Sequence, residues 1–427
     1  MQQGDAPARA ERKQTFRGWI VVLGLTMVFG GATGLFFNCN GVFMSPVPEA
    51  LGVTRGAFSL YTTIGSFVGM GAMVFYGELY RRYPNRIRTM MLVSCIVCSG
   101  CVMGYSFATR VWHFYILSAV YGMMQANVSG LSLTTIINNW FIEKKGLATG
   151  IAFSGSGLVA AIMTPIATNV VETYGWRWGY RLLSALGLCM MLFAILVCIR
   201  TSPEPLGQQP LGAVKSADGT APPLTYTGIT RSTALKTPAF YMIALAYIFI
   251  GLCGQGTLPH LIAYLTGIGF GQSRAASIQS AIMTLMIVGK IGMGALFDRI
   301  GPVKSSVVTG FLIFSSVTAL AFIQVSPLMV IFFTAAYGLG GSSVMTVPYS
   351  YLMSENFGTR EYAAIYSTCN TMSGLFSAFG SPLAGVLFDR AGDYRYVWPT
   401  FMVLATIGWA LLISSAVISK KKDYKNA

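Results

Sequence analysis

The sequence predicts an all-α membrane protein in which twelve transmembrane helices form two related six-helix bundles. The 427 residues are 54% hydrophobic and only 10% charged, whereas a soluble domain carries about 25% charged residues. Twelve apolar stretches are long enough to cross a bilayer, which takes about 20 residues of helix. The last six stretches repeat features of the first six at a constant offset of 217 residues.

Short connections join the twelve stretches, apart from one longer segment in the middle of the chain. Residues 200–237 are rich in Pro, Gly and Ala, which is typical of a flexible linker. The end of this segment, from Ile229 to Lys236, is expected to form a short surface helix. The predicted domains are an N-terminal half, 1–199, a cytosolic linker, 200–237, and a C-terminal half, 238–427. The spans are expected near residues 18–43, 57–77, 88–108, 112–138, 147–171, 178–199, 239–266, 275–297, 304–324, 328–352, 362–387 and 397–418.

The internal repeat holds without a gap from the first helix of each half to the fifth. The matched pairs are Gly34 and Gly251, Gly52 and Gly269, Gly77 and Gly294, Arg82 and Arg299, Ser156-Gly157 and Ser373-Gly374, Pro165 and Pro382, and Gly175 and Gly392. A single pair carries little weight because Gly is common here, but one constant offset is hard to obtain by chance. The repeat predicts two halves related by an axis along the membrane normal, with the substrate site between them near the midplane.

The basic residues predict the orientation of the chain in the membrane. With the N-terminus inside, the predicted cytosolic segments hold 21 of the 29 Lys and Arg residues and the outer segments hold 7. This bias places both termini in the cytosol and the chain in the cell membrane, plasma or inner, as a multi-pass protein. The net charge of +15 is dispersed over these loops, so it does not indicate nucleic-acid binding.

The remaining basic residue, Lys290, is predicted to lie inside the membrane. It stands eight residues before a charged turn that begins at Asp298, which places it about 12 Å from that helix end. A cation at this depth is costly and points to function. All 14 acidic residues lie in loops, termini or helix ends, so an anionic substrate is the expected counter-charge. The alternative is that Lys290 extends to the interface and only anchors its helix.

A second motif begins near Lys290 and reads Gly294-x3-Asp298-Arg299-x-Gly301-x2-Lys304. It resembles the signature of the major facilitator superfamily, and the first half carries a degenerate copy in GELYRRYPNRIR, residues 77–88. There Arg81 replaces the expected Asp, Pro84 replaces the Gly, and Glu78 is a candidate substitute for the acid. Such charges can pair with neighbouring helix ends and bias a gate. The predicted gating residues are Gly77, Glu78, Arg82, Gly294, Asp298, Arg299, Gly301 and Lys304.

Other motifs resemble the monocarboxylate-transporter and oxalate/formate-antiporter branch of that superfamily. They are Asn139-Trp140-Phe141, Lys144-Lys145-Gly146-Leu147-Ala148, Ser154-Gly155-Ser156-Gly157, Leu51-Gly52-Val53-Thr54-Arg55, Phe58-Ser59, His260-Leu261 and Tyr264-Leu265. The resemblance implies two six-helix bundles and a cation at the Lys290 position that neutralises a substrate carboxylate.

This chain also departs from the branch at three positions. A second cation of the oxalate antiporter aligns with Cys369, beside Asn370. A first-helix Lys of the animal carriers aligns with Asn38, and their Asp before the eighth-helix cation aligns with Met286. One fixed charge is therefore expected, which suits a single carboxylate better than a dianion.

Several polar residues are further candidates for substrate contact. His260 is a candidate proton carrier or substrate ligand, or else a hydrogen-bonded residue between helices. Asn38, Asn40, Gln255 and Asn370 are candidates for lining the cavity, or for interhelical hydrogen bonds. No catalytic residue, metal ligand or cofactor is expected. Cys95, Cys98 and Cys101 have no acidic residue or His nearby, so their spacing is read as helix packing.

The favoured function is secondary active or facilitative transport of a small organic anion, with a monocarboxylate preferred, by alternating access. Uniport, antiport and proton symport stay open, so the expected partners are the anion, a proton or counter-anion, and the lipid bilayer. The oligomeric state is also open. The alternative is an exporter of a neutral or other small molecule. A non-transporting sensor on a transporter scaffold is less favoured.

Overall fold

The computed structural model describes residues 16–44, 46–213, 227–326, 328–341 and 343–421. These residues are mostly helical. The first six spans comprise α1 (Gly18–Phe29) with η1 (Gly30–Leu35) and η2 (Asn38–Phe43), α3 (Arg55–Arg82), α4 (Ile87–Tyr105), α5 (Val111–Gln125) with α6 (Gly130–Trp140), α7 (Lys145–Tyr174), and α8 (Trp176–Phe193) with η5 (Ala194–Cys198). The last six comprise α10 (Pro238–Gly267), α11 (Gln272–Ala321), which holds two spans, α12 (Leu328–Ala336) with η7 (Tyr337–Gly341) and α13 (Val347–Phe357), α14 (Tyr362–Ser377) with α15 (Gly380–Ala391), and α16 (Val397–Lys421).

Short helices occupy the connections. They are α2 (Pro46–Leu51), η3 (Pro84–Arg86), η4 (Ala126–Val128), η6 (Glu204–Leu206) and α9 (Arg231–Ala234). The last of these lies within the stretch from Ile229 to Lys236 where a surface helix is expected, but it is only four residues long.

The helices account for twelve membrane crossings. Within the described residues, nine helical segments are long and apolar enough to span a membrane. One of them, Ser277–Ala321, contains two crossings because the chain turns at Gly301, whose φ of 78° suits a residue without a side chain. The pairs α5–α6 and α12–α13 each form one further crossing from two shorter helices. The predicted all-α fold of twelve spans is therefore confirmed.

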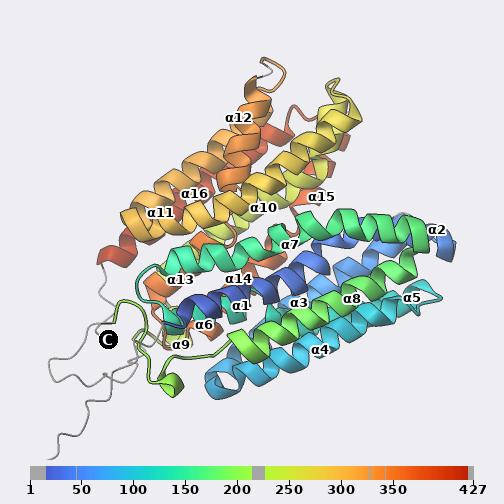
Figure 1. Cartoon of the computed structure of the whole chain (residues 1–427). Helices are drawn as coiled ribbons and strands as arrows, with labels where there is room; N and C mark the ends of the chain where they lie inside the picture. The colour runs from blue at the N-terminus through green and yellow to red at the C-terminus, as the bar shows by residue number, and fades with distance from the viewer. Residues whose placement is uncertain (1–15, 45, 214–226, 327, 342, 422–427) are drawn as a thin grey trace, which may run out of the picture.

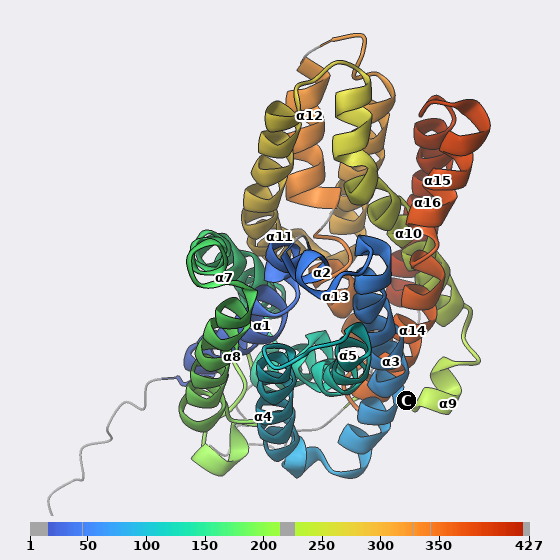
Figure 2. The ribbon, with the colours of Figure 1, turned by 90° about the vertical axis from the view of Figure 1, so that its right-hand side faces the viewer.

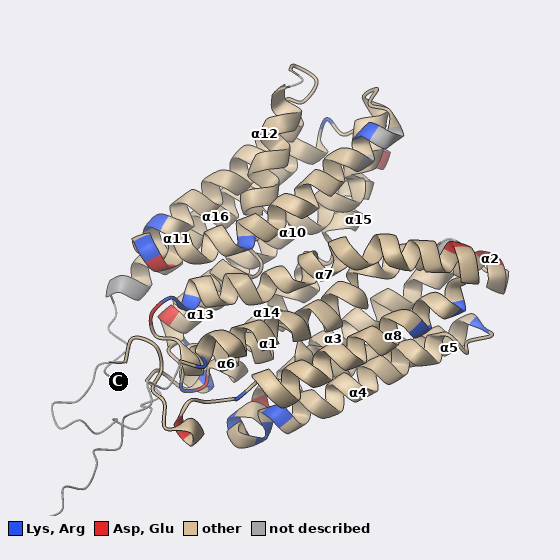
Figure 3. Ribbon diagram, viewed as in Figure 1, with Lys and Arg blue, Asp and Glu red and all other residues tan. Residues whose placement is uncertain are grey.

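The helices form two bundles, one from α1 to α8 and the other from α10 to α16. The two bundles lie side by side at one end and diverge toward the other, as Figure 1 shows and the turned view in Figure 2 supports. We call the end where they meet, at which α1 begins and α16 ends, the terminal face. Charged residues gather toward the two ends of the helices, and their middle parts are almost wholly uncharged (Figure 3).

Small residues set the distances between helices within each bundle. Where α3 crosses α5, a Cβ added to Gly122 would meet the carbonyl oxygen of Gly65, and Ser118 Oγ donates a hydrogen bond to the carbonyl oxygen of Tyr61. Helices in lipid gain little free energy of association from burying apolar side chains, because the lipid tails are apolar too. Close packing of the helix backbones therefore contributes to their association. These glycines are therefore part of the packing of the N-terminal bundle.

Two pairs of helices hold the bundles together. In one interface α7 packs against α11, and in the other α3 packs against α14. The offset of 217 relates α3 to the first part of α11, and α7 to α14. The two interfaces are therefore repeat equivalents of each other.

The crossing of α3 and α5 gives a stability prediction. Gly122→Ala should lower the free energy of unfolding by about 1–3 kcal/mol, because the new methyl group overpacks the crossing. Gly100→Ala is the matched control, since a Cβ on this exposed residue meets nothing within 4 Å. Thermal melting of the purified variants measures the difference. Equal melting temperatures for the two variants would contradict the role of Gly122.

Candidate functional site

Lys290 lies between the two bundles with its charge buried. Its residue is 7% exposed, and no other Lys or Arg, and no Asp or Glu, is buried among the described residues. Lys290 Nζ donates to the carbonyl oxygen of Phe153 at 3.3 Å and approaches Ser156 Oγ at 3.5 Å, both on α7. The side chain therefore crosses to the other bundle instead of extending along α11 to the interface. Both of its acceptors are neutral.

The Gly- and Ser-rich part of α7 allows this contact. A Cβ added to Gly150 would meet the backbone carbonyl oxygen of Lys290, and one added to Gly157 would meet Ile287 Cγ1 at 2.9 Å. On the other side of α11, a Cβ on Gly289 would meet the backbone of Leu339 in η7. The helix that carries Lys290 is thus enclosed between two elements, and this fixes where its side chain can point.

Asn38 and Lys290 meet at one residue of α7. Asn38 Nδ2 donates to the carbonyl oxygen of Ser156 at 3.3 Å, and the hydroxyl of the same serine faces Lys290 Nζ. Asn38 is itself exposed, on η2 of the N-terminal bundle. The structure therefore brings these two candidates together around Ser156, a contact that the sequence did not predict. The only signal was the Ser-Gly-Ser-Gly motif.

Asn40 lies beside a small aromatic cavity inside the N-terminal bundle. Its Oδ1 accepts a hydrogen bond from Tyr61 OH. The cavity measures about 50 Å³, and its lining includes Phe36, Phe37, Tyr105, Tyr121, Gln125 and Tyr180. Because Phe37 adjoins Asn38 in the chain, this cavity begins close to the contact with Ser156.

The other predicted ligands lie elsewhere. Asn370, on α14, donates to Met73 Sδ at 3.0 Å across the second bundle interface. Gln255 is exposed on α10. His260 lies within the C-terminal bundle, where Nδ1 is 3.1 Å from Tyr394 OH and Nε2 is 3.2 Å from both the carbonyl oxygen and the Oγ of Ser381. These contacts match the interhelical alternative for His260 and do not include Lys290.

The signature motif near Lys290 makes a contact between the bundles through Asp298. Its carboxylate accepts hydrogen bonds from the backbone N–H groups of Gly146, at 2.8 Å, and Leu147, at 2.7 Å. Both groups belong to the first turn of α7, where backbone donors lack helical partners and the helix dipole favours an anion. Gly146 and Gly294 let the backbones approach, since a Cβ on either would meet the carbonyl oxygen of the other. We call this contact the first latch.

The other residues of the two motifs have different surroundings. Arg299 and Lys304 are exposed, and Gly301 forms the turn already described. In the first half, a Cβ on Gly77 would meet the carbonyl oxygen of Ala363 on α14. Glu78 makes ion pairs with Arg81 and Arg82, both one turn further along α3. These contacts of Glu78 therefore stay within one helix.

The cysteines that share a three-residue spacing line one face of α4. Cys95, Cys98 and Cys101 are all buried there. In the part of the chain that the structure describes, no group of three or more His, Cys, Asp or Glu residues is placed to hold a metal ion.

Comparison with known proteins identifies the family. Residues 26–381 match the family described as the Major Facilitator Superfamily. The chain belongs to this superfamily. It is therefore a multi-pass membrane transporter and not an enzyme, and its substrate is a small molecule.

Curated relatives of the chain carry the monocarboxylate transporter name. Monocarboxylate transporter 13 of Bos taurus is 25% identical over 97% of this chain and 95% of its own length. Monocarboxylate transporter 2 of Rattus norvegicus is 22% identical over 94% of this chain and 83% of its own length.

Solved structures of the same fold include two transporters. The E. coli fucose:proton symporter FucP is similar with a TM-score of 0.70 and 12% identity, over 94% of this chain and 98% of that one. The human organic anion transporter MFSD10 is similar with a TM-score of 0.65 and 16% identity, over 93% and 98%. At these identities the likeness establishes the fold alone.

The first latch gives a conformational prediction. Asp298→Ala should reduce the population closed at the terminal face by about 5- to 30-fold, because two hydrogen bonds to a charged group are lost. Spin labels at the exposed positions Ile142 and Lys304, with the exposed Cys189 replaced by Ser, report the distance between the bundles.

The matched control for this experiment is Asp393→Asn, which removes an exposed acid that pairs with Arg395 and lies outside the first latch. A distance distribution that Asp298→Ala leaves unchanged would show that the first latch does not hold the bundles together.

Proposed function

We propose that this chain transports a small organic anion, a monocarboxylate, by exposing a site at Lys290 alternately to the two sides of the membrane. The observation that carries this proposal is the buried ammonium group between the bundles, which has no buried acid near it among the described residues. The two bundles supply the moving parts, since their interfaces separate at one end and close at the other when the bundles rock.

The charge of Lys290 sets the preferred substrate. A buried cation costs several kcal/mol, and two neutral acceptors offset only part of this cost. A substrate carboxylate would neutralise it, and Ser156 with Asn38 would supply hydrogen-bonding groups beside the pair. With one buried cation in the described part of the chain, one carboxylate gives a neutral complex, whereas a dianion would leave a buried negative charge.

The comparisons support this class of substrate. The relatives described above are named monocarboxylate transporters, and their similarity extends over nearly the whole of this chain. One solved structure of the same fold is named as an organic anion transporter. Lys290 is consistent with an anionic substrate, because it supplies a positive charge at the bundle interface.

We also propose an orientation and a conformational state. The excess of Lys and Arg in the segments at the terminal face assigns that face to the cytosol, in the cell membrane. The bundles meet at this face and diverge toward the other one (Figure 1). The structure then corresponds to a state closed to the cytosol, in which substrate approaches Lys290 from outside.

Lys290→Gln tests the proposal directly. The variant should lose at least about thirtyfold in uptake of labelled lactate into proteoliposomes, because removing one partner of a buried charge pair costs about 2–5 kcal/mol. Lys290→Arg should keep part of the uptake, since it retains the charge but changes its shape. A thermal-shift screen against monocarboxylic and dicarboxylic acids should show stabilisation of the wild-type protein by monocarboxylates.

Arg274→Gln is the control for loss of a charge from the same helix, because Arg274 is exposed near the start of α11. Uptake by Lys290→Gln at the wild-type rate would refute the proposed site. Stabilisation by monocarboxylates that persists in Lys290→Gln would place the anion elsewhere.

A further inference from the structure

The second bundle interface carries charges opposite to those of the first latch. The offset of 217 relates Asp298 to Arg81, and it relates Lys144, just before α7, to Glu361, just before α14. Arg81 on α3 is therefore a base at the position where the first latch has its acid. Glu361 is an acid just before α14, the helix that packs against α3. Compared with the superfamily signature alone, Arg81 looks like the loss of a contact. Its repeat position opposite Glu361 indicates a contact of reversed polarity instead.

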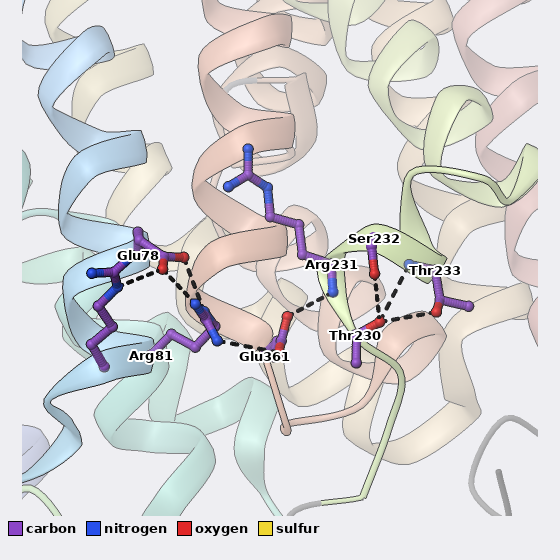
Figure 4. Close-up of polar contacts among 8 residues, drawn as sticks. Glu78, Arg81, Thr230, Arg231, Ser232, Thr233 and Glu361 are labelled. Atoms are coloured by element: carbon purple, nitrogen blue, oxygen red, sulfur yellow. Dashed lines mark hydrogen bonds and ion pairs between the residues drawn. The ribbon is translucent and has the colours of Figure 1, made fainter.

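The side chains are arranged for this contact. Arg81 Nη1 lies 4.0 Å from Glu361 Oε1, and the two side chains are 41% and 17% exposed. Arg81 also donates through Nε and Nη2 to the two carboxylate oxygens of Glu78, at 2.9 Å and 2.5 Å, which fixes the direction of its guanidinium group. Figure 4 shows Arg81 between Glu78 and Glu361. Gly77 allows the close approach of α3 and α14 here, as Gly294 does for α11 and α7.

The end of the segment between the halves holds Glu361 in place. Glu361 Oε2 accepts a hydrogen bond from the backbone N–H of Arg231 at 2.7 Å, as Figure 4 shows. The backbone N–H of Thr359 donates to the carbonyl oxygen of Thr227 at 2.8 Å, and Ile229 N–H donates to Phe357 at 3.1 Å. One carboxylate oxygen of Glu361 therefore faces residues 227–231, and the other faces Arg81.

The beginning of the same segment is attached in an equivalent way to the other bundle. Leu211 N–H donates to the carbonyl oxygen of Trp140 at 2.9 Å. The carbonyl oxygen of Leu211 accepts from Ile142 at 2.9 Å and Glu143 at 3.0 Å. The offset of 217 relates Trp140 to Phe357, so the segment contacts two equivalent loops. These loops precede α7 and α14, which pack against the opposite bundle at the two interfaces.

We propose that Arg81 and Glu361 form a second latch at the terminal face, opposite in polarity to the first, and that residues 227–231 position Glu361 for it. Both residues are positioning residues for the closed state and do not touch the substrate. The second latch acts on the rocking of the bundles, so it does not depend on which anion Lys290 binds. Its failure and that of the substrate proposal are separable, because its test needs no substrate.

A double-mutant cycle on Arg81→Gln and Glu361→Gln tests the second latch. Glutamine at position 361 keeps an acceptor for the Arg231 N–H group, so the cycle removes charge and preserves that contact. The spin-label pair at Ile142 and Lys304 is the readout, because it lies across the first interface and reports opening of the whole face. Each single variant should lower the closed population about two- to fivefold, as expected for a partly exposed ion pair.

The double variant should resemble either single variant, since the two residues act through one contact. Raising the salt concentration from 0.1 M to 1 M should reduce the closed population of the wild type more than that of the double variant. Arg86→Gln is the matched control, because it removes an exposed charge close to the same helix end. Additive effects of the two single variants, or equal effects of Arg86→Gln and Arg81→Gln, would overturn the second latch.

The role of residues 227–231 has its own test. A Cβ on Gly228 would meet the carbonyl oxygen of Phe357, so Gly228→Val should separate this segment from the loop before α14. The variant should lower the closed population about two- to fivefold in the wild-type background and have no effect when Glu361 is Gln. The same shift in both backgrounds would overturn the positioning role. A thermal melt of each variant confirms that the comparison is between folded proteins.

Discussion

The structure depends on one constraint, which is that an ammonium group lies between two apolar bundles and no acid is buried beside it in the described part of the chain. Lys290 reaches this place because Gly150 lets the backbones of α7 and α11 come together. Its hydrogen bonds to Phe153 and Ser156 then cross from one bundle to the other. Any motion that separates the bundles changes the solvation of this charge, so the proposed site at Lys290 would link the charge of the substrate to the position of the bundles.

The first latch at the terminal face uses backbone groups as well as a side chain. The first latch joins a carboxylate to the start of a helix, and the glycines at positions 146 and 294 allow the contact. The first latch lies between the bundles, so it can break while the contacts within each bundle remain. A transporter requires this, because its two states must interconvert while each bundle remains folded.

Much of the fold could be predicted from the sequence. The lengths of the apolar stretches predict the membrane spans, and the internal repeat predicts the two bundles. The burial of Lys290 followed from its distance to the charged turn at Asp298. Its partners did not, since Ser156 lies 134 residues away on another helix and a serine carries no distinctive signal. The partners of His260 could not be predicted from the sequence either, because residue type alone does not tell which face of the helix the side chain occupies. Comparison with the superfamily signature showed only that Arg81 replaces the expected Asp. It could not show a contact with Glu361, because Glu361 lies outside the motif of residues 77–88.

The two contacts at the terminal face differ in the kind of group that accepts the charge, and this difference has a mechanistic consequence. Asp298 binds the backbone N–H groups of Gly146 and Leu147 and not a charged side chain. Arg81 faces a carboxylate whose position depends on the segment between the halves. The proposed second latch joins two charged side chains, so we expect it to weaken with salt more than the first latch does and to depend on the position of residues 227–231. With both contacts, the proposed mechanism lets the segment between the halves change the stability of the closed state while the first latch stays in place.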